Sequence, residues 1–481
     1  MGTPTATDDF QELRELLSSA NPNDIVKAFA ANPAFRAAEW EELTTENNPY
    51  RRPVRPDDLA WLNYSKPMPE AKALKLSALL GHRMLRNIYD AEFHFLPDHR
   101  DDANSADLAT FYSARNRILG ALARPILERH LFTVLDEVRP EPAGVTGSGA
   151  GAEVDALARA AATELERRQA EPGAAFEAAR RTKHRRESSN FLVLQVSAFR
   201  PAGWAALGRI GLGEFHRAHP DLRTLLQDRY QRTVAGGASY RELLTAAELT
   251  PVVGAYWQLY LGSSLGRGNH LLHLAASPEH FFALLGGIVH DLIDQAAIAA
   301  PVAEVAAEGF GYHGAPLATE QLTPDGVADL VRQLVGPLRE RFGPQVVEGF
   351  HRGFQDARWL AALWDRDLAE QLSWADRIEE FQEKAEKIDQ HLTNENITVD
   401  LDTFVETNEE TSTTHVHNEH RLVMIESGQM HFWNNTTHKI ELNEGDKLLI
   451  PVSRLHGSTV LSGSCTYHQP IIPDEMLQQF L

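Results

Sequence analysis

Along most of the chain, apolar residues recur at spacings of three and four, which is the pattern of helices that bury one face. The pattern predicts helices throughout residues 8–138 and again from 154 to 389. Core helices are predicted at 252–272, 281–296, 327–342 and 346–364. Representative apolar sets are Leu76, Leu79, Leu80 and Leu85, and then Leu157, Ala160, Ala161 and Leu165.

After residue 390 the helical spacing gives way to short runs of β-branched and aliphatic residues. Turn residues separate the runs: Gly428 follows one, and Gly445-Asp446 precedes another. This pattern predicts an all-β barrel or sandwich at the C-terminal end. The runs are 397–399, 422–425, 439–442 and 448–450.

The predicted fold class is therefore multidomain α plus β. A proline-containing break at 139–142 and the Gly-, Ser- and Ala-rich segment 144–151 have the composition of a linker, and they divide the helical part in two. We predict a helical N-terminal domain at 1–138, a second helical domain at 152–388 and a β domain at 390–481.

The composition argues against several classes of function. The 481 residues carry a formal net charge of −21, which is unfavourable for binding nucleic acid through its phosphates. The one cysteine, Cys465, can form no internal disulfide. The first residues are too polar for a signal peptide, and we find no apolar run long enough to span a bilayer. We therefore expect a cytoplasmic protein that binds neither nucleic acid nor membrane.

Candidate chemistry is concentrated in the predicted β domain. His415 and His417 are two positions apart on an extended segment, so their imidazoles point to the same face. His456, on a later strand, can complete a set of three ligands. Three neutral imidazoles on one side of a divalent ion leave positions open for substrate or oxygen, which is typical of a catalytic metal site. Fe(II) suits such a site, and Zn(II), Cu(II) and Ni(II) are alternatives.

The spacing of these histidines resembles the two-part metal signature of cupin barrels. Two positions depart from that signature: Arg421 replaces a glutamate ligand, and Ser453 replaces a glycine. The alternative is a cupin that has lost its metal and keeps histidines in a polar interior. The matching residues are His415, His417, Gly428, Gly445, Pro451 and His456.

Further residues near the motif are candidates for supporting roles. Arg421 could bind an acidic group of the substrate as a bidentate pair, or it could pair on the surface with Glu419 or Glu426. Glu419 and His420 are possible additional ligands. For catalytic roles the candidates are Arg421, Arg454 and Tyr467, the last two because they lie on or near the strands that carry His456.

Segments spread over almost the whole chain resemble the N-nitrosourea-forming metalloenzymes of streptozotocin biosynthesis. The order of the predicted domains, two helical domains followed by a β domain, also matches that family. The segments are 48–52 (Asn-Pro-Tyr-Arg-Arg), 88–92 with Phe95 and Pro97, 256–261 with Ser263-Ser264-Leu265, 370–374 and 454–457.

This resemblance implies an N-terminal domain that forms a homodimer, a central heme-oxygenase-like diiron domain and a C-terminal cupin with one iron. In the family, the diiron domain hydroxylates guanidine nitrogens of a methylated arginine. The cupin then rearranges the hydroxylated guanidine to an N-nitroso product. His415, His417 and His456 match the cupin iron ligands.

The central domain departs from the family's diiron pattern. Arg200 lies near the place of the first glutamate, and Ser239 near that of a histidine, and an arginine would repel the metal ions. We therefore expect this domain to keep the heme-oxygenase-like fold without its diiron site. Other acidic and histidine clusters in the domain are His290, Asp291 and Asp294; Glu214, His216 and His219; and His351 with Asp356.

Three hypotheses follow. The first is a cupin enzyme with one Fe(II) per chain and O2 as co-substrate, which forms an N–N bond in natural-product biosynthesis. Its substrate would be a small amino-acid-derived molecule, an N-hydroxylated arginine made by a separate N-hydroxylase, and its product an N-nitroso compound or diazeniumdiolate. The second is an N-oxygenase with an atypical metal site at His290, Asp291 and Asp294. The third is a non-enzymatic cupin scaffold that binds a metal or another ligand.

Overall fold

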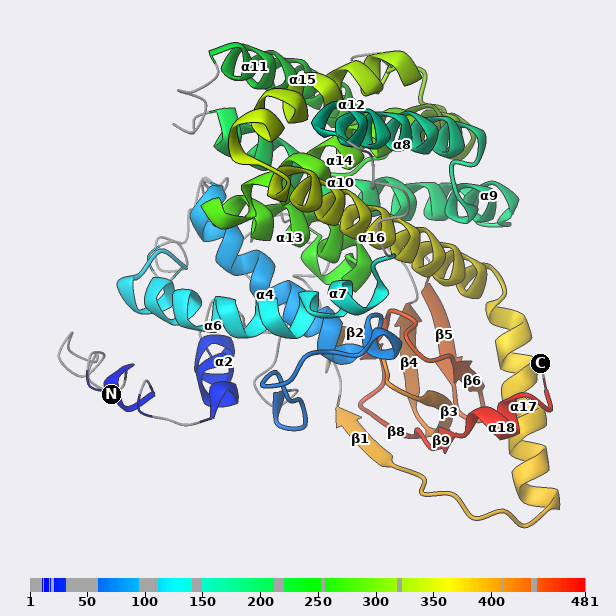
Figure 1. Cartoon of the computed structure of the whole chain (residues 1–481). Coiled ribbons are helices and arrows are strands. Elements are labelled where there is room, and N and C mark those ends of the chain that lie inside the picture. Colours follow the sequence, from blue (N-terminus) through cyan, green and yellow to red (C-terminus); the bar gives the residue numbers. More distant parts are fainter. Residues whose placement is uncertain are drawn as a thin grey trace.

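A computed structural model of the protein shows a body of packed helices followed by a smaller region of two β-sheets (Figure 1). The expected fold class, helical parts followed by a C-terminal β part, is confirmed. The positions of the domain boundaries stay predictions. The described residues are 11, 13–16, 18, 21–31, 59–94, 109, 111–140, 149–211, 220–251, 256–317, 322–407, 411–433 and 439–480. The segments 48–52 and 144–148, with Phe95 and Pro97, lie outside them.

The first helices share one apolar core, in which α4 is the central element. α4 carries Leu80, Met84 and Leu85 into this core, as the spacing of its apolar residues predicts. The side chain of Ser113 caps the start of α6 by accepting a hydrogen bond from the backbone N–H of Asn116. The bounds are α2 Pro22–Ala30, η3 Glu70–Lys72, α4 Leu76–Phe93, α6 Ala114–Phe132 and α7 Val134–Val138.

The longer helices of the body surround α14 and α16, which cross at very short range. A Cβ atom at Gly286 or Gly353 would collide with backbone of the opposite helix, so glycine is required at both positions. The bounds are α8 Ala150–Ala170, α9 Ala174–Arg181, α10 Arg185–Gly211, α11 Pro220–Ala235, α12 Gly237–Ala246, η5 Trp257–Leu259, α13 Gly262–Ala276, η6 Pro278–His280, α14 Phe281–Phe310, α15 Pro324–Phe342, α16 Gln345–Asp376 and α17 Ile378–Asn394.

The continuous helix predicted over 252–272 is wrong over 256–261, and residues 252–255 lie outside the described part of the chain. α13 begins only at Gly262, after the short η5 and an extended residue, Leu261. The buried side chain of Gln195 stabilises this break: its amide donates to Leu259 O at 2.8 Å and accepts from Leu261 N at 2.9 Å. Backbone groups that a helix would satisfy internally are satisfied here by a side chain.

The sequence also holds a longer apolar stretch than we expected. Pro278–Phe310, which includes α14, is long and apolar enough to cross a membrane by length and composition. However, 72% of its most apolar window is buried inside the helical body, as in the core helix of a soluble protein.

The β region consists of two antiparallel sheets that share one core. One sheet has the order β1-β8-β3-β6, with β9 paired to β3, and the other has the order β2-β7-β4-β5. Alternating residues of β3 show the division: Val423 and Ile425 enter the shared core, whereas Leu422 faces outward. The bounds are β1 Thr403–Thr407, β2 Thr411–His415, β3 His420–Ser427, β4 Gln429–Trp433, β5 Lys439–Asn443, β6 Lys447–Ile450, β7 His456–Val460, β8 Ser464–His468, β9 Ile471–Ile472 and α18 Asp474–Leu477.

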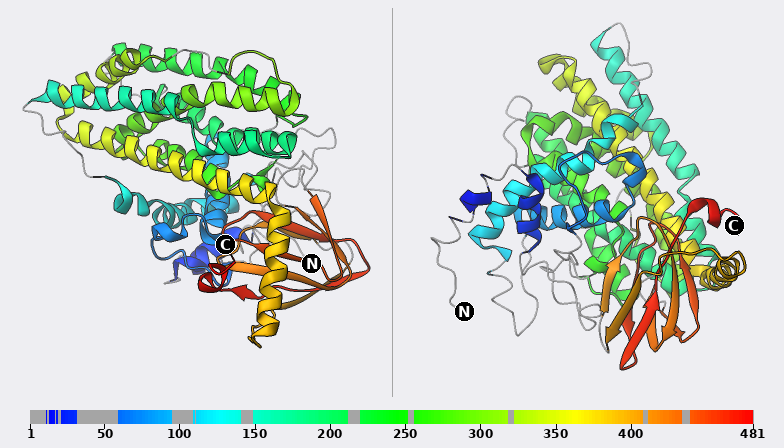
Figure 2. Two further views of the ribbon diagram at one scale, coloured as in Figure 1. Left: turned by 90° about the vertical axis from the view of Figure 1, so that its right-hand side faces the viewer. Right: turned by 90° about the horizontal axis from the view of Figure 1, so that it is seen from below.

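α17 covers the outer face of the five-stranded sheet (Figure 2). Ala385, Ile388 and Leu392 on this helix pack against Leu422 and Leu449 of the sheet. The helix is the direct continuation of α16, so the chain passes from the helical body onto the sheet before it forms the first strand. The β region is therefore enclosed by the helices on one face.

Candidate metal centre

The alternation of side chains along β2 separates two functions. Thr414 and Val416 face the helical body: the Thr414 hydroxyl donates to the carbonyl oxygen of Gln258, and Val416 joins a helical core cluster. Because side chains alternate along an extended chain, His415 and His417 point the other way. The predicted shared face of the two histidines is therefore present, and contacts of the intervening residues fix it.

The structure brings His456 to the same place. His456 is the cross-strand partner of His415, on the neighbouring strand β7. The three ring centroids are 4.5 to 4.9 Å apart, and one ligand atom from each residue lies within 4.8 Å of the others. The Nε2 atoms of His415 and His417 are 3.0 Å apart. Three nitrogen donors from two strands thus converge on one point.

The protonation states of these histidines favour metal binding. His456 Nδ1 lies 2.8 Å from the carbonyl oxygen of Arg454, which can only accept, so Nδ1 carries the proton and Nε2 keeps its lone pair. Burial, followed by the neighbouring histidines, lowers the pKa of His417 and of His456 well below the usual range. Both rings are therefore neutral near pH 7, which is the form that binds a metal ion.

The donor geometry fits a divalent transition metal. Two nitrogen ligands at right angles, each about 2.1 Å from one ion, lie about 3.0 Å apart. That separation matches the distance between the Nε2 atoms of His415 and His417. The three histidines could therefore hold a metal ion.

Aromatic side chains hold the His456 ring in place. Phe432 stacks on the ring at 5.5 Å between centroids with an interplanar angle of 18°, and Trp374 meets it edge-on at 6.5 Å. Trp374 comes from α16 but belongs to the apolar core of the β region. A helix of the body thus supplies part of the wall around a candidate ligand.

Two buried polar side chains of the helical body hold the backbone beside the histidines. Arg83 on α4 donates to Thr414 O at 2.9 Å and to Gln258 O at 3.0 Å. Gln371 on α16 pairs with both backbone groups of Leu455, each at 2.9 Å. Neither contact is predictable from local spacing, because the partners on the ligand segments lie 331 and 84 positions away.

The positions of the cupin signature that need special backbone conformations are also visible. Gly428 and Gly445 have φ of +91° and +90° in the turns after β3 and before β6. Ser453, which stands at a usual glycine position, has φ of +64°, and its N–H donates to His417 O at 3.1 Å. The serine therefore adopts the left-handed conformation that favours glycine.

The other candidates near the motif contact different partners. Arg421 donates to Asp402 at 2.6 Å and to Gln469 O, and it also forms a longer ion pair, at 3.9 Å, with Glu419, one of its two predicted surface partners. Arg454 pairs with Glu370 on α16 at 2.8 Å. These two arginines connect structural elements.

The structure also places one further catalytic candidate and the two possible additional ligands. The Tyr467 hydroxyl donates to Glu406 at 2.8 Å from within the apolar β core. The ring of His420 accepts from Val452 N and lies 3.3 Å from Asp474, and Glu419 is exposed. Among the described residues, neither His420 nor Glu419 belongs to the group of possible metal ligands.

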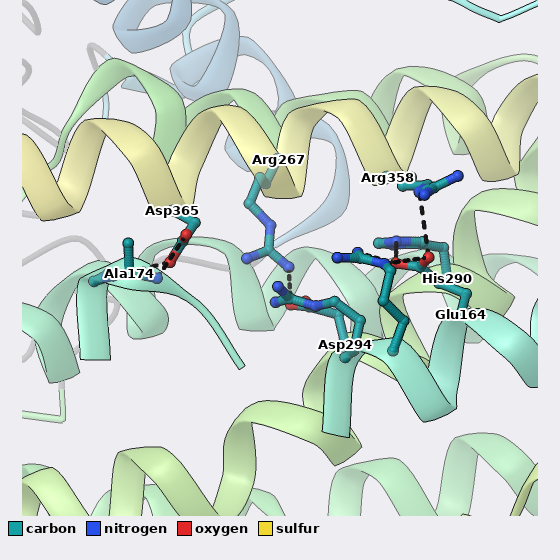
Figure 3. Close-up of polar contacts among 10 residues, drawn as sticks. Glu164, Ala174, Arg267, His290, Asp294, Arg358 and Asp365 are labelled. Carbon is teal, nitrogen blue, oxygen red and sulfur yellow. Dashed lines mark hydrogen bonds and ion pairs between the residues drawn. The ribbon is translucent and has the colours of Figure 1, made fainter. Parts of the chain in front are cut away.

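The clusters predicted in the central helices form ion pairs. Each carboxylate oxygen of Asp294 accepts from a different buried arginine: Arg267 donates to one of them (Figure 3), and Arg168 donates to the other. His290 lies 3.8 Å from Glu164, and Asp291 accepts from Gln295 at 2.5 Å.

The remaining clusters give no metal site within the described part of the chain. Asp356 pairs with Arg139 at 2.8 Å rather than with His351. Glu214, His216 and His219 lie outside the described residues. Of the residues that the structure describes, only the three histidines of the β region form a group that could hold a metal ion.

Comparison with known proteins gives a relative of full length. The chain is similar to the nitrosourea synthase of Streptomyces achromogenes subsp. streptozoticus, with 26% identity over 458 residues that cover 94% of this chain and 95% of that protein. No protein-family model matches the chain. The similarity spans the helical body as well as the β region, in agreement with the segments noted in the sequence. This relative supports the resemblance to the N-nitrosourea-forming family over almost the whole length of the chain.

Proposed function

We propose that this protein is an Fe(II)- and O2-dependent enzyme that forms an N–N bond by oxidative rearrangement of an N-hydroxylated arginine-type substrate. The observation that carries the proposal is the convergence of His415, His417 and His456 in a chain that resembles a nitrosourea synthase along its length. The product would be an N-nitroso compound or a diazeniumdiolate in a natural-product pathway.

The metal ion would be held by these three imidazoles. Fe(II) would supply redox chemistry with O2 and open coordination positions at which an N-hydroxyguanidine can bind. The chain contributes neutral donors, because burial keeps His417 and His456 unprotonated. Three neutral ligands leave the ion's charge uncompensated by the protein, which favours an anionic or chelating substrate.

The surrounding residues position the ligands. Phe432 and Trp374 fix the orientation of the His456 ring, and the Arg454 carbonyl oxygen keeps the proton on Nδ1. Such partners of a metal ligand set its orientation and tautomer. The hydrogen bonds of Gln371 to Leu455 hold the neighbouring backbone.

The helical body is proposed to act without a diiron site, so that a separate N-hydroxylase supplies the substrate. The buried Arg168 and Arg267 on either side of Asp294 support this division, since a metal ion at Asp294 would have to displace an arginine. A homodimer through the N-terminal helices and a cytoplasmic location complete the proposal.

The test is anaerobic reconstitution with iron, followed by admission of O2 to mixtures that contain N-hydroxyarginines and mass spectrometry of the products. We expect about one iron per chain and a product with a new N–N bond, and His417→Ala should abolish both. Three irons per chain, or hydroxylation of free arginine, would contradict the proposed division of labour. A second measurement adds nitric oxide to the Fe(II) protein as a surrogate for O2 and records the iron–nitrosyl spectrum. If the protein binds iron but addition of substrate leaves this spectrum unchanged, the result would favour a non-enzymatic scaffold.

A further inference from the structure

A second candidate site lies in the helical body, in a cavity of about 270 Å³ between α10, α12 and the η5 segment. Apolar and aromatic side chains form most of its wall, and Arg86, Arg200 and Arg241 contribute positive charge. Among the lining residues that the structure describes, none is acidic. Pockets for drug-sized ligands begin at about 300 Å³, so this cavity suits a molecule of a few to a dozen or so heavy atoms.

Three polar groups at this cavity have no hydrogen-bond partner within the described part of the chain. They are Nε of Arg200, Nε1 of Trp204 and the hydroxyl of Tyr240. Arg200 is 5% exposed and Tyr240 is 3% exposed, so bulk water does not satisfy these groups readily. The two N–H groups can only donate, and the phenol can donate as well. A ligand that satisfies them must therefore carry acceptor atoms.

The orientation of Arg200 leaves donors available at the edge of its guanidinium. The guanidinium carbon lies 3.5 Å from the centroid of the Tyr240 ring and 5.7 Å from that of Trp204. Its hydrogen bond to the carbonyl oxygen of Leu317 is long, at 3.5 Å. A guanidinium that stacks through its face keeps its in-plane N–H groups for a planar acceptor such as a carboxylate.

The charges around the cavity also favour an anion. Arg86 is neutralised by an ion pair with Asp90 at 2.9 Å. The fully buried Asp294 forms ion pairs with Arg168 and Arg267, so it does not neutralise the arginines at the cavity. Burial raises the pKa of Asp291 to about 7, so this carboxyl is only partly ionised near neutral pH and compensates Arg200 incompletely. Arg200 and Arg241 thus remain as net positive charges.

We infer that this cavity binds a small organic carboxylate with a flat apolar part. The carboxylate accepts hydrogen bonds from Arg200, Tyr240 and Trp204, and the apolar part lies against the aromatic wall. Guanidines and other cations are excluded by the arginines. None of the three histidines lines this cavity, and the inference does not depend on the reaction proposed for them.

The experiment compares three probes of one shape and different charge. The metal-free full-length protein is titrated with benzoate, benzamide and benzamidine, and calorimetry and tryptophan fluorescence report binding. We expect saturable binding of benzoate, at least tenfold weaker binding of the neutral amide and no saturable binding of the cation. Absence of saturable benzoate binding, equal affinity for benzamide, or saturable binding of benzamidine would overturn the inference.

Variants locate the binding. Arg200→Gln should weaken benzoate binding about tenfold or more, whereas Arg209→Gln, on the exposed side of the same helix, should leave it unchanged. Tyr240→Phe removes one donor with little change of shape, and it gives the test independently if Arg200→Gln does not fold. His417→Ala should bind benzoate like the parent protein, which separates this site from the histidine cluster. Unchanged affinity in a folded Arg200→Gln or Tyr240→Phe variant, or loss of binding in His417→Ala, would contradict the assignment.

Discussion

Two clusters of polar side chains in this protein, one in the β region and one in the helical body, differ in which hydrogen-bonding and metal-binding atoms they leave available. In the β region, His415, His417 and His456 turn nitrogen lone pairs toward one point, with no carboxylate in the group. In the helical body, both oxygens of Asp294 are occupied by arginines. A dense set of acidic residues and histidines is therefore no evidence of a metal site by itself. Spare lone pairs that converge are the deciding feature.

The largest expected effect is the loss of metal binding when one of the three histidines of the β region is removed. His456→Ala removes one of three donors, so we expect the affinity for Fe(II), Co(II) or Zn(II) to fall on the order of 100-fold or more. Metal titration followed by visible spectroscopy of the Co(II) form measures the loss. His431→Ala is a matched control, since His431 lies on β4 outside the cluster. Equal metal binding by the two variants would refute the assignment.

The next effect concerns the helical half. Asp294→Ala leaves Arg168 and Arg267 buried without their partner, and breaking such a buried pair typically costs about 3–5 kcal/mol of the free energy of unfolding. Chemical denaturation measures this loss. The metal content per folded chain should stay unchanged. A drop in bound iron with the β region intact would show instead that the helical cluster takes part in metal binding.

A third test asks whether a buried neutral histidine outside the cluster of three affects stability without affecting metal binding. Burial lowers the pKa of His82 in the helical body to about 3, against an ordinary 6.5. Below pH 6.5 the unfolded chain binds a proton that the folded chain does not, so the folded state loses stability as the pH falls from 6.5 toward 3. His82→Gln should reduce this loss by up to about 1.4 kcal/mol per pH unit while metal binding is unchanged. Denaturation at pH 5.0 and 6.5 measures the slope, and an unchanged slope would contradict the buried neutral state.

The smallest effect sharpens the description of the β region. Ser453 has a positive φ that glycine adopts without strain, and its backbone N–H binds His417 O. Ser453→Gly should therefore leave metal affinity unchanged and raise the free energy of unfolding by about 0.5 kcal/mol, the balance of relieved strain and lost chain entropy. Ser453→Val should destabilise the protein. A destabilised glycine variant would show that the serine side chain contributes more than its backbone conformation costs.

Residue patterns were sufficient for most of the long helices and for the three histidines. Helical spacing located α14, α15 and α16, and the period-two alternation around Val416 placed both neighbouring imidazoles on one face. Both are local properties, because they depend on residues a few positions apart. The turn glycines Gly428 and Gly445 are local in the same sense.

Long-range pairing was not accessible in this way. Arg168 and Asp294 are 126 positions apart, so no spacing rule links them, and the acidic cluster was open to a metal-binding interpretation. The side chain of Gln195, from α10, binds the backbone of Leu259 and Leu261 where a continuous helix was predicted. The apolar pattern of 252–272 does not show this contact. Arg421 forms its short ion pair with Asp402, a residue just before β1, whereas its pair with the neighbouring Glu419 is longer.

The packing of the helical body against the segments that carry the histidines determines whether the β region can be produced as a separate fragment. Val416 and Leu455 belong to a helical core, and Trp374 belongs to the β core although it lies before residue 390. A fragment that starts at residue 390 would expose two aliphatic side chains to water and leave a hole the size of an indole beside His456. The histidine centre is thus not a portable module, and transplanting it into another scaffold requires the end of α16 as well.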